Sequence, residues 1–214
     1  MCVLPDCCAQ QEDTDKNKKV GGELRGARFF GWRSVMELKA KRLILRPWRH
    51  EDTERLYRLC RAPEIGAGAG FPPHESPDMS RAVIQNVLSQ PENYAVVNRR
   101  TGEVIGSASL ILSLEGSDCK RPGDAEVGYW IGREYWGWGF ATEALGALVR
   151  HAGEDLGLRR LWGVIFPDNT ASRRVLEKAG FTFDHREDTY VAQCGIFRET
   201  LYFCRPAQGG AEAD

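Results

Sequence analysis

The chain has 214 residues, of which 42% are hydrophobic and 28% charged, a composition typical of one soluble globular domain or at most a tight pair. Its 29 basic and 30 acidic residues leave a formal net charge of −1, so the charge pattern gives no indication of nucleic-acid binding. No stretch approaches the ~18 consecutive apolar residues of a membrane span, and no N-terminal apolar run is long enough for a secretory signal. We therefore expect a cytoplasmic protein with no nucleic-acid and no membrane partner.

The seven cysteines are dispersed and odd in number, which does not indicate a disulfide framework and fits a reducing compartment. Cys2, Cys7 and Cys8 lack a paired Cys-x-x-Cys partner, and we predict no metal site. Residues 1–35 contain a polar stretch without helical or strand periodicity, so they are predicted to be a poorly ordered extension. The domain is predicted to span residues 36–205, and residues 206–214 are predicted to form a flexible tail.

In chain order, the pattern predicts strand 42–48, helices 50–60 and 80–88, strands 94–98, 104–112 and 125–131, helix 140–152, strand 161–166, helix 171–179, and strands 181–184 and 195–203. The glycine-rich run at 66–70, followed by Pro72 and Pro73, predicts a loop. Three consecutive strands joined by short turns favour a mixed α+β sheet over a doubly wound parallel sheet.

The stretch 128–142 is the most informative, because a strand ending at Ile131 is followed by a turn with Gly137 and Gly139 and then by a strong helix. The free N–H groups and the dipole of such a helix N-terminus favour a diphosphate, and glycines let it approach the backbone. The spacing is not that of a P-loop, and the dinucleotide fingerprint would need Gly where Thr142 stands. From spacing alone, a helix cap with a packing glycine is an equal alternative.

A later segment, Asn169-Thr-Ala-Ser172, opens a helix that closes with Glu177-Lys-Ala-Gly-Phe181. Here the chain resembles the GNAT superfamily of acyl-CoA N-acetyltransferases, and within it the ribosomal-protein N-terminal acetyltransferase (RimJ/RimL) type. The resemblance covers about residues 37–205 and rests on three motifs in order. Lys41-Arg-Leu-Ile-Leu-Arg-Pro47 is similar to TxRLxLRP, Glu134-Tyr-Trp-Gly-Trp-Gly-Phe-Ala-Thr-Glu-Ala144 to the glycine motif and ATEA, and Asn169–Ser172 to NxxS.

The resemblance implies the GNAT fold, in which a central twisted, mostly antiparallel sheet of about seven strands is flanked by about four helices. It implies acetyl-CoA as co-substrate, received where the fourth and fifth strands splay apart. The residues that it places at the cofactor are Tyr129, Trp130, Ile131, Trp136, Gly137, Trp138, Gly139, Phe140, Ala141, Thr142, Asn169 and Ser172.

Two positions depart from the family pattern. Glu134 stands where Gln or Arg is usual, and Leu176 stands where many members have a Tyr that protonates the departing thiolate. The resemblance to this branch assigns help at the thiol to Ser172 instead. Read without the family, Asn169 and Ser172 are also typical helix caps.

Transfer to an amine requires that the amine first lose a proton. A protein α-amine, with a pKa near ~8, needs less help than a lysine near ~10.4. Glu126 is an acidic residue in an otherwise apolar predicted strand and is the candidate general base, with a solvent-facing strand residue as the equal alternative. Asp124, expected in the preceding turn, is the weaker candidate. A backbone N–H near residues 129–131 is expected to hold the developing oxyanion.

The sequence therefore predicts an N-acetyltransferase that moves an acetyl group from acetyl-CoA to a primary amine, with a protein N-terminal α-amine as the first candidate acceptor. A small-molecule amine (an aminoglycoside, polyamine or amino acid) and a non-catalytic acyl-CoA sensor are the alternatives. Trp130 is expected to pack in the core, whereas Trp136 or Trp138 is expected to cover the cofactor or the acceptor entrance. We expect acceptor specificity in loops 63–79 and 113–124, and a monomer or homodimer.

Overall fold

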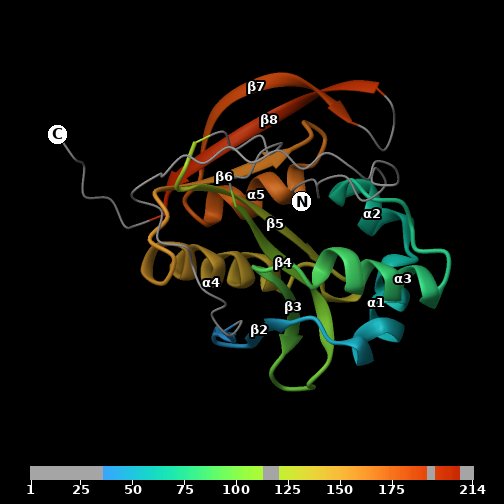
Figure 1. Ribbon diagram of the computed structural model, residues 1–214. Coiled ribbons are helices and arrows are strands. Elements are labelled where there is room, and N and C mark those ends of the chain that lie inside the picture. The colour runs from blue at the N-terminus through green and yellow to red at the C-terminus, as the bar shows by residue number, and fades with distance from the viewer. Residues whose placement is uncertain (1–35, 113–120, 192–195, 208–214) are drawn as a thin grey trace, which may run out of the picture.

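The computed structural model describes residues 36–112, 121–191 and 196–207. Its centre is an eight-stranded sheet with the strand order β1-β2-β3-β4-β5-β6-β8-β7 (Figure 1). The strands are β1 (Leu38–Lys39), β2 (Leu43–Pro47), β3 (Asn93–Asn98), β4 (Val104–Leu112), β5 (Asp124–Ile131), β6 (Arg160–Ile165), β7 (Thr182–Val191) and β8 (Ile196–Pro206). Every neighbouring pair is antiparallel except β5 with β6.

The helices cover both faces of this sheet and enclose two hydrophobic cores. They are α1 (Thr53–Cys60), α2 (Pro63–Ala69), α3 (Pro77–Val83), α4 (Phe140–Glu154) and α5 (Thr170–Lys178), with a π-helical turn at Ile84–Leu88. The larger core lies between α4 and α5 and one face of the sheet. The smaller core lies between the helices α1, α2 and α3 and the other face (Figure 1). Among the described residues, no helix combines the length and the apolar character that crossing a bilayer requires.

The mixed α+β class is confirmed, with eight strands and five α-helices in the described segments where about seven and four were expected. The additional strand, β1, has two residues, too few for a pattern in the sequence to indicate a strand. The predicted extension 1–35 and most of the predicted tail lie outside the described residues, as do Cys2, Cys7 and Cys8.

The prediction of a loop at 66–70 is wrong, because residues 63–69 form the helix α2. Pro63 occupies the first turn, where its missing N–H is harmless, and Gly70 ends the helix in the left-handed conformation, with φ of 74°. A Cβ at Gly66 would lie 2.1 Å from the carbonyl oxygen of Phe71, so close packing requires the glycine there. Ile65 and Ala69 are buried in the smaller core, so their packing outweighs the low helix propensity of the run.

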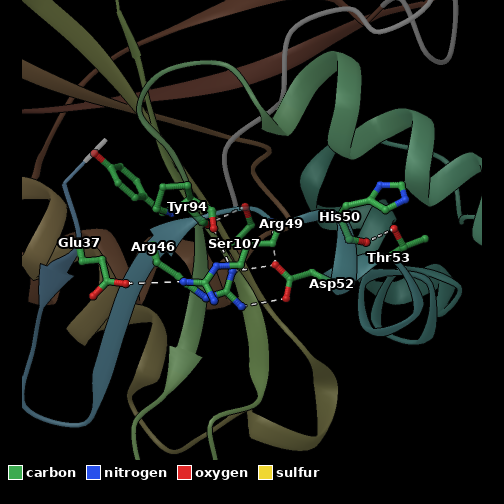
Figure 2. A network of polar contacts seen from close by, with 9 residues as sticks. Glu37, Arg46, Arg49, His50, Asp52, Thr53, Tyr94 and Ser107 are labelled. Atoms are coloured by element: carbon green, nitrogen blue, oxygen red, sulfur yellow. Dashed lines mark hydrogen bonds and ion pairs between the residues drawn. The ribbon is translucent and has the colours of Figure 1, made fainter. Parts of the chain in front are cut away.

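A bidentate ion pair anchors β2 to the start of α1 (Figure 2). Arg46 Nη1 and Nη2 lie 2.7 and 2.8 Å from the two carboxylate oxygens of Asp52, and both side chains are largely buried. Asp52 also accepts the backbone N–H of Arg49 at 2.9 Å. Such paired, hydrogen-bonded charges are costly to separate, since either one alone would be buried without compensation.

β7 forms one edge of the sheet, opposite β1, and pairs with β8 along its length. Its side chains Phe183 and Tyr190 are exposed, and Tyr190 lies 5.4 Å from the ring of Phe197 on β8. The run Asp184-His-Arg-Glu-Asp188 lies between these two aromatic residues. The sequence predicted only the first part of this strand, because its polar middle carries no hydrophobic alternation.

A buried histidine connects the C-terminal part of α4 to the chain just before β3. His151 Nε2 lies 2.9 Å from Glu92 Oε2, and its Nδ1 lies 2.7 Å from Asp155 Oδ2. Tyr94 Oη donates to the same Glu92 oxygen at 2.6 Å. Burial disfavours the charged imidazolium, but the hydrogen bonds and charges of Glu92 and Asp155 outweigh it and raise the pKa of His151.

The raised pKa of His151 predicts a pH-dependent stability. In the unfolded chain the imidazole titrates near ~6.5, so the native contacts stabilise the fold fully below that pH. This contribution is lost as the pH rises through the higher native pKa. Urea titrations across this range should show a falling free energy of unfolding for the wild type and a flatter profile for His151→Gln. Parallel profiles would contradict the role of the charged imidazole.

Candidate active site

The sheet splits between β5 and β6. Their parallel pairing comprises Asp124 with Arg160, Ala125 with Leu161, and Glu126 with Trp162, and it ends there although both strands continue. β4 still pairs with β5 as far as Ile131, and β8 pairs with β6 to the end of that strand. The two strands therefore diverge beyond Glu126, between the fourth and fifth predicted strands, where the family resemblance places the splay.

Glu126 lies at the last paired position before this split. The residue is only 7% exposed, so the solvent-facing alternative is wrong. Alternate strand residues share a face, which places Glu126 on the same face as Asp124 and Trp130. Asp124 is the first residue of β5 rather than part of the preceding turn, and its Oδ2 accepts the indole N–H of Trp162 at 3.0 Å. Two buried carboxylates and an anchored indole thus lie together where the strands separate.

The turn before α4 has the conformation that its glycines predict. Gly137 and Gly139 have φ of 79° and 78°, a region that L side chains rarely adopt. Gly139 is the N-cap and offers no side chain to the N–H groups of the first helical turn. The indole of Trp136 folds back and donates to the carbonyl oxygen of Ile131 at 2.6 Å, whereas Trp138 is 67% exposed. The helix N-terminus is therefore left open for an anion.

Arg42, which lies just before β2 and is distant in sequence, contacts this turn. Its backbone N–H and its Nε donate to the two carboxylate oxygens of Glu143, and its Nη1 donates to the carbonyl oxygen of Trp138 at 3.0 Å. The guanidinium also lies 4.5 Å from the centroid of the Phe140 ring. Sequence reasoning assigned no role to Arg42 or Glu143, although both belong to the motifs that carry the resemblance.

At the start of α5, Asn169 is the N-cap, and its Oδ1 accepts the backbone N–H of Ser172 at 3.1 Å, as the capping alternative predicts. Ser172 is buried, and its carbonyl oxygen accepts the hydroxyl of Tyr129 at 3.2 Å. This bond joins β5 beyond the split to the helix that follows β6. The structure therefore brings Tyr129, Asn169 and Ser172 together, while their contact with a cofactor stays a prediction.

Three other residues predicted to contact the cofactor have side chains that are buried in the two hydrophobic cores. Trp130 packs against Trp48 and Phe71, with ring centroids 6.5 and 6.3 Å apart, and its expected place in the core is confirmed. Ile131 and Phe140 belong to the larger core. Their backbone groups are thus the atoms left for the predicted contact. Within the described segments, no group of three or more His, Cys, Asp or Glu side chains is placed to hold a metal ion.

A mixed sheet that splits beside an open helix N-terminus places a strand divergence next to backbone donors that suit a diphosphate. The chain matches the acetyltransferase (GNAT) domain family over residues 42–182. The protein belongs to this family and is an acetyl-CoA-dependent N-acetyltransferase.

Among its relatives is the uncharacterized N-acetyltransferase p20 of Bacillus licheniformis, which is 32% identical over 67% of this chain and 81% of that protein. A GNAT-family acetyltransferase from Bacillus anthracis has the same fold, with a TM-score of 0.71 at 19% identity over 80% of this chain and 99% of that one. Mycobacterium smegmatis RimJ, solved in complex with CoA-disulfide, gives a TM-score of 0.68 at 20% identity, covering 81% of this chain and 88% of that one.

Two glycines of α4 differ in backbone conformation, so their replacement by alanine should have opposite effects on stability. Gly139→Ala forces an L side chain into the left-handed region and should destabilise the fold by about 1–2 kcal/mol. Gly146 lies on the exposed side of the same helix, with nothing within 4 Å of an added Cβ, so Gly146→Ala should stabilise by about 0.5–1 kcal/mol. Urea unfolding of both variants measures the two signs. Equal stability of Gly139→Ala and wild type would contradict the conformational requirement.

Proposed function

We propose that the protein transfers the acetyl group of acetyl-CoA to a primary amine, and that a protein N-terminal α-amine is its first acceptor class. The observation that carries the proposal is the position of Glu126, a buried carboxylate at the point where β5 and β6 separate. Support for the α-amine comes from the motif resemblance to the RimJ/RimL type and from the lower pKa of an α-amine relative to lysine.

The residues present fit acetyl-CoA in three places. The free N–H groups of Phe140, Ala141 and Thr142 at the uncapped start of α4 suit the diphosphate. The β5–β6 pairing ends at Glu126, and the divergence of the two strands beyond that residue suits the pantetheine chain. The start of α5, with Asn169 and Ser172, lies within a hydrogen bond of this β5 segment. Bound acetyl-CoA supplies the acetyl group as an activated thioester together with a thiolate leaving group.

In the proposed mechanism, Glu126 takes a proton from the acceptor ammonium, directly or through one water. The neutral amine can then attack the carbonyl carbon of the thioester. Backbone N–H groups of β5 beyond Glu126, where the pairing with β6 has ended, would donate to the developing oxyanion. Ser172 assists the departing CoA thiolate. Leu176, which stands where many family members have a Tyr, has no proton to donate to this thiolate. Trp162, held by Asp124, borders the base on the β6 side.

The proposed base predicts a specific loss of turnover in Glu126→Gln. The amide keeps the size of the side chain but cannot accept the proton, so kcat should fall about 10²- to 10⁴-fold while the affinity for CoA is unchanged. Asp124→Asn is the matched control, because its amide oxygen can still accept the Trp162 N–H. Thiol release from acetyl-CoA measures kcat, and calorimetry measures CoA binding. A larger loss in Asp124→Asn would transfer the role of base to Asp124.

The same assay tests the acceptor. A mass-shift screen should compare peptides with free N-termini, the same peptides with blocked N-termini and a free lysine, and a panel of small amines. Acetylation of the free N-termini is the expected result. Modification confined to small amines would replace the acceptor class, and CoA binding without thiol release for any amine would favour a sensor.

Ser172→Ala separates a role at the thiol from a role in capping. The described hydrogen bonds of Ser172 use its backbone N–H and C=O, so removing the hydroxyl leaves the cap intact. We expect kcat to fall at least tenfold with little change in the midpoint of urea unfolding. Turnover equal to that of the wild type would remove Ser172 from the mechanism.

A further inference from the structure

The anion site proposed at the start of α4 has a local electrostatic problem. Glu143 lies in the first turn of this helix, close to the N–H groups of Phe140, Ala141 and Thr142. A carboxylate there complements the helix dipole, but it also repels any diphosphate that approaches the same N–H groups. Because the Glu143 side chain is only 16% exposed, water screens its charge poorly.

Arg42 compensates the charge of this carboxylate. Both oxygens of Glu143 are engaged, one by the backbone N–H of Arg42 and the other by Nε at 2.7 Å. The contact joins residues 101 positions apart in the chain and connects two of the sequence motifs, RLILRP and ATEA. An arginine with a purely structural role could form this pair without facing the anion site. The position of the remaining guanidinium nitrogens therefore distinguishes the two roles.

The remainder of the guanidinium faces the turn. Nη1 donates to the carbonyl oxygen of Trp138, and the plane lies over the ring of Phe140. Nη2 is 3.7 Å from the position that a Cβ on Gly139 would take, and within the described part of the chain no hydrogen bond uses Nη2. The Arg42 side chain is 42% exposed, and its Nη2 lies beside Gly139, the N-cap of α4.

We propose that Arg42 is a positioning residue for the CoA diphosphate: it cancels the charge of Glu143, fixes the glycine turn, and leaves the Nη2 edge beside the anion. This inference rests on the proposed binding of acetyl-CoA at α4. A phosphate oxygen at this edge would meet a charge-assisted donor in addition to the backbone N–H groups. The net charge of −1 is then compatible with an anionic co-substrate, because the positive charge is local.

The test is the dissociation constant for CoA, measured by calorimetry on the full chain. Arg42→Ala should bind CoA at least tenfold more weakly, because it removes a donor and exposes the charge of Glu143. Glu143→Gln alone should bind CoA more tightly than wild type, since Arg42 then carries an uncompensated charge. The double variant Arg42→Ala, Glu143→Gln should recover part of the lost affinity. Pantetheine, which lacks the diphosphate, should bind all four proteins equally.

Arg150→Ala is the matched control. Arg150 also joins α4 to the start of the domain, through a hydrogen bond from Nη2 to the carbonyl oxygen of Lys39 at 2.8 Å, but it lies toward the other end of the helix. It should therefore leave the CoA affinity unchanged. Circular dichroism and the unfolding midpoint of each variant identify any loss of fold.

The outcomes separate the two proposals. A folded wild type that does not bind CoA overturns the proposed function and this inference with it. A wild type that binds CoA while Arg42→Ala stays within twofold of it overturns the inference alone. Equal losses in Arg42→Ala and the double variant, or an equal loss in Arg150→Ala, assign Arg42 a purely structural role and also overturn it.

Discussion

The parallel pairing of β5 with β6, which stops at Glu126 and Trp162, is the constraint on which the site depends. The chain leaves β5 through α4 and returns into β6, and α5 follows β6, so both helices begin beyond the carboxyl ends of the two strands. In open sheets with parallel neighbours, this is the side on which ligands bind. The antiparallel neighbours β4 and β8 hold the outer sides of both strands, so the split does not disrupt the rest of the sheet.

The strong periodic elements could be predicted from the sequence because their burial is one-sided. The stripe Ala144, Leu145, Leu148 and Val149 of α4 is buried as the helical period requires. The helix α2 could not be predicted, because its glycine-rich run has a low helix propensity and the burial of Ile65 and Ala69 that stabilises it arises only in the folded chain. The two-residue strand β1 and the polar middle of β7 carry no signal of their own.

For the candidate site, the sequence selected several residues that the structure brings together, but it did not indicate their contacts. It selected Glu126 as an acidic residue in an apolar strand that leads into the glycine turn. Whether this side chain is buried depends on its face of the sheet, and the pattern left both alternatives open. It also indicated the glycine turn and the start of α5. The arginines of the first motif were visible only as letters of the resemblance, since their partners, Asp52 and Glu143, are fixed by folding. One arginine near each end of β2 ties this strand to a different helix, α1 or α4.

The charged middle of β7 has a consequence for how the molecule behaves in a crowded solution. An outer strand presents unpaired backbone N–H and C=O groups that can template pairing with another chain, and the exposed Phe183 and Tyr190 would strengthen such contacts. The intervening run from Asp184 to Asp188 places charges of both signs along that edge, so a second strand would have to desolvate them to pair. Charges on an edge strand oppose edge-to-edge aggregation, and here they lie between aromatic residues that remain at the surface.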